Sequence, residues 1–160
     1  MNDAIIGTFT WFLGFPLITC IGQLSDMAVY ALFNITTYDQ VAVLYLKIAM
    51  QSPALLVSML ISILVVAPIL EEFLFRGLLQ TYLKNYLGKK GAIFVAALLF
   101  GLFHFNSAQG VGNISIILSL FSFGCFLGFI YERQGSLLAS ISLHATFNAV
   151  NVLYIISQQP

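Results

Sequence analysis

Residues 54–76 read ALLVSMLISILVVAPILEEFLFR, a largely apolar run whose last six residues include three charged side chains. A helix of about 20 apolar residues crosses a bilayer, and this stretch is long enough to do so. Glu71, Glu72 and Arg76 are three of the 12 formally charged residues of the whole chain. Because charges inside a membrane span cost several kcal/mol unless they are paired or hydrated, this stretch predicts a membrane helix that carries a functional polar cluster.

The composition of the whole chain agrees with a membrane protein. Of the 160 residues, 60% are hydrophobic and 8% are charged, whereas charged residues make up about a quarter of ordinary soluble domains. The net charge is zero and there is no long basic run, which excludes the electrostatic surface that nucleic-acid binding needs. The two cysteines have no CxxC spacing, which argues against a disulfide framework or a cysteine metal site. We therefore expect an integral, multi-pass membrane protein with membrane lipid as its surroundings.

The hydrophobic segments predict an all-α fold, a polytopic transmembrane helix bundle with about five spans. Pro16 and Asp26 interrupt the first span, and Pro68 is expected to kink the second. We expect two parts, an N-terminal membrane helix and loop in residues 1–52 and a four-helix catalytic membrane core in residues 53–160. The predicted spans cover about residues 4–32, 53–83, 90–106, 113–131 and 136–156.

The basic residues of the connecting loops give an expected orientation. Lys84, Lys89, Lys90 and Arg133 fall in two loops on the same face of the five-span arrangement, and Lys47 falls in a loop on the opposite face. Lysine and arginine in short loops favour the cytoplasmic side, which places the N-terminus in the cytoplasm. The compact chain and short loops favour a bacterial plasma membrane.

The two adjacent glutamates are expected to do different work. Glu72 and Arg76 are four residues apart, so they share a helix face in the order that favours an ion pair. Glu71 points about 100° away from Glu72 and is left free to act. Pro68 removes one hydrogen bond of the helix and leaves a backbone carbonyl open close to Glu71.

Both histidines of the chain lie on predicted membrane helices. In a hairpin that turns near Gly88, Glu71 lies 17 residues before the turn and His104 lies 16 after it, so the two reach the same depth. His144 and Asn148 share one face of the last helix, within about two helical turns of that level. Each histidine alone fits a satisfied core residue, and the Glu72–Arg76 pair fits a structural role. The convergence of Glu71 with three polar groups at one depth instead favours a functional pocket.

These residues form three motifs whose order and spacing resemble those of the CAAX protease and bacteriocin-processing family, also called the Abi family. The motifs are Glu71-Glu72-x-x-x-Arg76, Phe100-x-x-x-His104 and His144-x-x-x-Asn148. The resemblance extends over about residues 53–156 and implies an intramembrane endopeptidase, a hydrolase that acts on a peptide or protein substrate.

The resemblance also implies individual roles. Glu71 matches the general base that holds and deprotonates a water together with His104. His144 and Asn148 match the pair that polarises the scissile carbonyl and stabilises its oxyanion. Glu72 and Arg76 match supporting positions.

The sequence leaves open whether the enzyme needs a metal. Two histidines and one carboxylate form a known catalytic zinc set, so Glu71, His104 and His144 are the candidate ligands if the enzyme uses a divalent metal such as zinc. The same three residues can also act on water without a metal.

Two other functions remain as alternatives. The chain could be a non-catalytic membrane scaffold or bacteriocin-immunity protein of the same fold, or a transporter or haem protein that uses the two membrane histidines. For an endopeptidase, the resemblance implies either prenylated C-terminal peptides or leader peptides and other membrane peptides as substrates.

Overall fold

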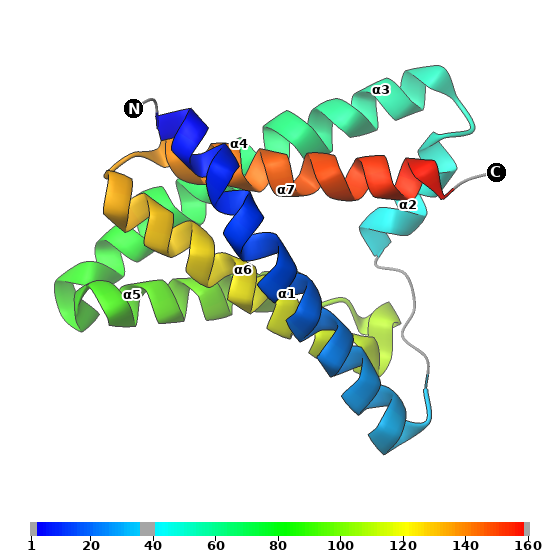
Figure 1. Ribbon diagram of the computed structural model, residues 1–160, viewed down its shortest axis with the longest axis horizontal. Helices are drawn as coiled ribbons and strands as arrows, with labels where there is room; N and C mark the ends of the chain where they lie inside the picture. Colours follow the sequence, from blue (N-terminus) through cyan, green and yellow to red (C-terminus); the bar gives the residue numbers. More distant parts are fainter. Residues whose placement is uncertain (1–2, 36–40, 159–160) are drawn as a thin grey trace.

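The structure is a computed structural model that describes residues 3–35 and 41–158 (Figure 1). Within these ranges it contains helices and no strands, which confirms the all-α prediction. The elements are α1 (Asp3–Phe33), α2 (Val41–Ala49), α3 (Pro53–Ile61), η1 (Ser62–Val66), α4 (Ala67–Glu72), η2 (Phe73–Gln80), α5 (Thr81–Phe103), η3 (Ser107–Gly112), α6 (Asn113–Gln134) and α7 (Leu137–Ser157).

Four helical stretches in the described part of the chain are long and apolar enough to cross a membrane: Asp3–Phe33, Pro53–Phe103, Ser107–Gln134 and Leu137–Ser157. The second stretch is divided at Gly88, whose φ of 66° and ψ of 176° are not helical. The chain turns back there, so α5 returns beside η2 and α6 (Figure 1). The bundle is therefore polytopic, and the stretch comprises the two spans that the sequence predicts.

The connections on either side of α6 are held by local hydrogen bonds. Gly135 takes the left-handed conformation, with φ of 62°, and its N–H donates to Tyr131 O at the end of α6. Only a residue without a Cβ adopts this conformation at little cost. Between α5 and α6, the side chain of Asn113 accepts from Asn106 N and donates to Asn106 O and Gly110 O. These bonds fix the loop that directly follows His104.

Helix α1 lies across α6 and α7 (Figure 1). Pro16 lies inside this helix and does not end it. Close contact with α7 depends on Gly7, because a Cβ there would clash with the backbone oxygen of Ala139. The loop expected between the first two spans contains the short helix α2, and residues 36–40 of that loop lie outside the described residues. The nine residues of α2 are too few to cross a bilayer.

The outer surface and the interior differ as expected for a protein in lipid. Large apolar side chains such as Phe9, Leu13 and Phe103 are exposed on the outside. The interior contains a buried apolar cluster: Ile18, Phe75, Phe100, Phe123, Leu127, Ile130, Ala139 and Leu143. Because lipid tails solvate the exposed groups, they carry no penalty in a membrane, and the chain is an integral multi-pass membrane protein.

Two glycines on α6 allow close packing. A Cβ on Gly124 would lie 2.9 Å from Cα of Ala97, and one on Gly128 would lie 2.6 Å from Oε1 of Gln80. Small residues at such positions let membrane helices approach closely. The carbonyls of both glycines then become reachable, since Arg76 Nη2 donates to Gly124 O at 3.1 Å and Gln80 Nε2 donates to Gly128 O at 3.1 Å.

The basic loops lie at one end of the bundle. Lys84 Nζ lies 3.1 Å from Glu132 Oε1, and Lys89 Nζ lies 4.0 Å from Glu132 Oε2. Lys84 and Lys89 flank the Gly88 turn, and Glu132 lies next to the α6–α7 turn. These ion pairs therefore join the two connections that the sequence places on the same face.

Candidate active site

Glu72 and Arg76 form the predicted ion pair. Arg76 Nη1 donates to Glu72 Oε1 at 3.0 Å, and both side chains are completely buried. The guanidinium also lies over the Phe100 ring, with Cζ 4.6 Å from the ring centroid. With its bond to Gly124 O, Arg76 joins η2, α5 and α6. A buried pair with these extra partners holds the helices in one arrangement.

His144 reaches the same carboxylate from α7. Its Nδ1 lies 2.9 Å from Glu72 Oε1, and its side chain is 6% exposed. An ionised carboxylate only accepts hydrogen bonds, so Nδ1 carries the proton and donates. The other ring nitrogen, Nε2, is therefore directed away from Glu72, on the side where Glu71 lies.

His104 is oriented by its own helix. Its Nδ1 lies 2.9 Å from the carbonyl oxygen of Phe100, one turn earlier. Because a carbonyl oxygen accepts and cannot donate, His104 also carries a proton on Nδ1. The two histidines are thus the same tautomer, with the proton on Nδ1, and each presents Nε2 to Glu71.

Glu71 lies between these two ring nitrogens. Its Oε2 is 4.0 Å from His104 Nε2 and 3.9 Å from His144 Nε2. Both distances exceed the length of a direct N–H···O hydrogen bond, which is at most about 3.2 Å. Oε2 is buried and has no hydrogen-bond partner among the described residues. A polar contact of this length suits a bridging water.

A zinc ion does not fit these three side chains as they stand. In a tetrahedral site with bonds of about 2.0–2.2 Å, neighbouring ligand atoms are about 3.3 Å apart. The two distances from Glu71 Oε2 are each more than half an ångström longer. In the described part of the chain, no group of three or more His, Cys, Asp or Glu side chains is arranged to hold a metal ion.

Asn148 has a different partner from the one expected. Its Nδ2 donates to the backbone oxygen of Ile63 in η1 at 2.9 Å. Glu71, His104 and His144 thus come together as predicted, whereas the amide of Asn148 is directed to the backbone before Pro68.

The structure also places Gln80, which the sequence did not single out, near the site, and it gives contacts to Phe100, which the sequence named only as part of the His104 motif. Gln80 is completely buried one turn after Arg76 and repeats its bond to an α6 carbonyl. Phe100 contacts Arg76 with its ring and His104 with its carbonyl. The i, i+4 spacing of Arg76 and Gln80 in an apolar helix was the available signal for Gln80.

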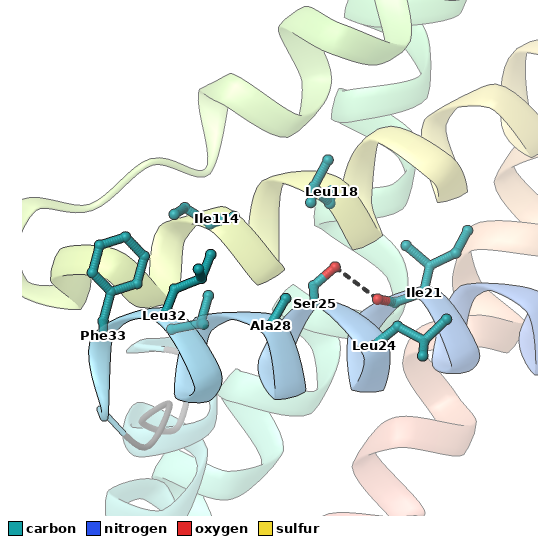
Figure 2. A pocket seen from close by; sticks show the side chains of 9 residues that line it. Ile21, Leu24, Ser25, Ala28, Leu32, Phe33, Ile114 and Leu118 are labelled. Atoms are coloured by element: carbon teal, nitrogen blue, oxygen red, sulfur yellow. Dashed lines mark hydrogen bonds between the residues drawn. The ribbon is translucent and has the colours of Figure 1, made fainter.

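The apolar hollow in Figure 2 is not the candidate site. It has a volume of about 300 Å³ and lies between the second half of α1 and the start of α6. The Ser25 hydroxyl that lines it donates to Ile21 O at 2.7 Å, and no residue of the polar cluster lines it. A second apolar hollow, of about 510 Å³, is lined by Phe105, which follows His104 in the sequence, and by Gly110, Val111, Asn113, Ile114, Ile117 and Leu118.

Known proteins resemble the part of the chain that carries this site. A family model described as type II CAAX prenyl endopeptidase Rce1-like matches residues 53–150. CAAX prenyl protease 2 of Homo sapiens is 31% identical over 97 residues, which are 52% of this chain and 30% of the human protein. The chain thus matches less than a third of that relative's length. No solved structure matches.

Proposed function

The chain belongs to the Rce1-like family of type II CAAX prenyl endopeptidases, and on this premise we propose that it is an intramembrane endopeptidase whose general base is Glu71. The family match confirms the resemblance that the motifs indicated. The observation that carries the proposal is the buried, unpartnered Oε2 of Glu71 between two Nε2 atoms at 3.9 and 4.0 Å.

In the proposed reaction, a water lies between Glu71 Oε2 and His104 Nε2. Glu71 takes a proton from the water, and the water oxygen attacks the carbonyl carbon of the scissile peptide bond. The electron pair of the carbonyl moves to its oxygen and gives a tetrahedral oxyanion. Collapse of this intermediate breaks the C–N bond, and the proton held on Glu71 passes to the leaving amine.

His144 is the proposed partner of the oxyanion. In its protonated form it donates Nε2–H to the carbonyl oxygen, while Nδ1–H stays on Glu72 at 2.9 Å. Glu72 and Arg76 keep this ring in place and do not touch the substrate. We assign the oxyanion to His144 and not to Asn148, because one of the two N–H groups of the Asn148 amide already donates to Ile63 O.

No step of this proposal passes through a metal. The spacing of Glu71, His104 and His144 suits a water better than a zinc ion. The proposed hydrolysis therefore uses water activated by Glu71 and His104 without a metal ion.

The proposed substrate is a prenylated C-terminal peptide. The name of the human relative supports this class, and the apolar hollow that Phe105 lines offers an apolar surface that a prenyl group can contact. The side chains of Glu71 and His104 are 20% and 32% exposed, compared with 6% for His144, so the approach is open on the side of Glu71 and His104. Leader or bacteriocin peptides are the second class, and a bacterial plasma membrane is the proposed location.

The experiment compares the native protein with Glu71→Gln, each purified in detergent and incubated with a farnesylated C-terminal peptide. Mass spectrometry identifies the products. Glu132→Gln is the matched control, since it removes a carboxylate of the same type that pairs with Lys84 at the other end of the bundle. We expect cleavage by the native protein and the control, and loss of about 10²- to 10⁴-fold in Glu71→Gln.

Equal cleavage by the native protein and Glu71→Gln would overturn the proposal. If neither cleaves the prenylated peptide, comparison of peptide termini in membranes of cells expressing each protein tests the other substrate class. Identical termini in that comparison would favour the non-catalytic scaffold.

A further inference from the structure

Pro68 leaves one identifiable carbonyl without its helical donor. In η1 the N–H of Ala67 donates to Ser62 O, five residues earlier. In this wider helical register the next N–H along the chain would belong to residue 68 and would reach Ile63 O. Proline has no N–H, so the helix itself cannot supply that bond.

Asn148 supplies the missing donor from another helix. Its Nδ2 donates to Ile63 O at 2.9 Å, across 85 residues of sequence. A carbonyl inside the bundle without a donor is unfavourable, so the amide and the proline-containing turn stabilise each other. In lipid no bulk water can replace the amide.

This bond fixes α7 at the level of the catalytic cluster. His144 lies one helical turn before Asn148 on the same face of α7, and Glu71 lies three residues after Pro68 on the other side of the bond. We propose that Asn148 is a positioning residue, which ties α7 to the carbonyl that Pro68 frees and thereby sets His144 against Glu72 and Glu71. Its role in cleavage rests on the endopeptidase function proposed above.

The test is a double-mutant cycle of Asn148→Ala and Pro68→Ala in the full chain, measured by thermal unfolding in detergent and by kcat and KM. Pro68→Ala restores a backbone N–H at this position that can reach Ile63 O. We expect Asn148→Ala to lower Tm by about 3 °C in the native background and by much less in the Pro68→Ala background. We expect kcat to fall about tenfold, with KM nearly unchanged, and to recover when Pro68→Ala is added.

Asn151→Ala is the matched control. Asn151 also donates through Nδ2, at 2.9 Å, but to Phe147 O of its own helix, so its removal should show no coupling to Pro68. Asn148→Leu keeps the side-chain shape without a donor and should reproduce the loss in Asn148→Ala, which keeps the proposal testable if Pro68→Ala does not fold. Native Tm and kcat in Asn148→Leu would overturn it.

Two further outcomes also overturn the proposal. One is an equal Tm loss on Asn148→Ala in both backgrounds. The other is a kcat loss of about 10²- to 10³-fold that Pro68→Ala does not relieve, which is the behaviour of a direct oxyanion donor. If Glu71→Gln cleaves as well as the native protein, the endopeptidase proposal fails, and the Tm cycle still decides whether Asn148 and Pro68 are coupled.

Discussion

His144 donates through Nδ1 to the same oxygen of Glu72, at 2.9 Å, that accepts a hydrogen bond from Arg76 at 3.0 Å. The sequence paired Glu72 with Arg76 alone. Because one carboxylate oxygen serves both, the buried ion pair also sets the ring orientation of His144 and with it the direction of Nε2 towards Glu71.

Arg76→Met should destabilise the protein strongly. It leaves the charge of Glu72 buried without its guanidinium, and breaking a buried pair in this way costs about 3–5 kcal/mol. The double variant Arg76→Met with Glu72→Gln removes both charges and should recover part of the loss. Thermal unfolding in detergent compares the native protein, the single variants Arg76→Met and Glu72→Gln, and the double variant. A double variant as unstable as the sum of the two single variants would contradict the buried-charge explanation.

Substitution of His104 should affect activity alone, whereas substitution of His144 should affect both activity and stability. His104 is 32% exposed and bonds only to a carbonyl of its own helix, so His104→Ala should lose about 10²-fold or more in kcat while Tm stays close to native. His144 is 6% exposed and bonds to buried Glu72, so His144→Ala should lower both kcat and Tm. Parallel kinetic and unfolding measurements check this, and equal Tm losses in the two variants would count against the assigned contacts.

Adding a single methyl group to α6 should show where the helices are closest. Gly124→Ala brings Cβ within 2.9 Å of the Ala97 backbone, which cannot yield easily, so a loss of about 1–3 kcal/mol is expected. Gly128→Ala meets the end of the Gln80 side chain and should cost less. Gly77→Ala is the control, since its Cβ meets nothing nearer than 3.4 Å. If thermal unfolding shows that Gly124→Ala loses the least stability of the three variants, this packing is contradicted.

Removal of metal ions should leave cleavage intact. The distances of 3.9 and 4.0 Å from Glu71 Oε2 to the two Nε2 atoms are too long for neighbouring zinc ligands. Treatment with a strong chelator followed by dialysis should therefore preserve the rate on the farnesylated peptide, and elemental analysis should find substoichiometric metal. Loss of activity that returns specifically with added zinc would refute this expectation.

The fold was largely predictable because local signals decide it. Apolar length sets the spans, and Gly88 and Gly135 end them with positive φ. Simple depth counting then brought Glu71, His104 and His144 together. Helix α2 was not anticipated, because a nine-residue apolar segment carries no span-length signal.

The finer geometry of the site was not predictable for a physical reason. The sequence predicts that Pro68 frees a carbonyl but not which one, since that depends on a helix register wider than the usual turn of about 3.6 residues. The partner of Asn148 follows from that register, and the bonds of Arg76 and Gln80 to α6 carbonyls follow from how closely two helices pack. Both are tertiary properties that no local pattern contains.

The segments η1 and η2 are π-helical, with wider turns than an α-helix. These turns decide how the helix tolerates the deletion of a residue. Each lies on one side of α4, and a wide turn holds about one residue more than an ordinary helical turn. Loss of a single residue from Ser62–Val66 would let that turn close to the ordinary pitch and leave the direction of Glu71 relative to α3 nearly unchanged, whereas loss of one residue from the ordinary turns of α3 would rotate Glu71 by about 100°. The wide turn can thus absorb a one-residue deletion, whereas the same deletion in the preceding α-helix would turn the Glu71 carboxylate away from His104 and His144.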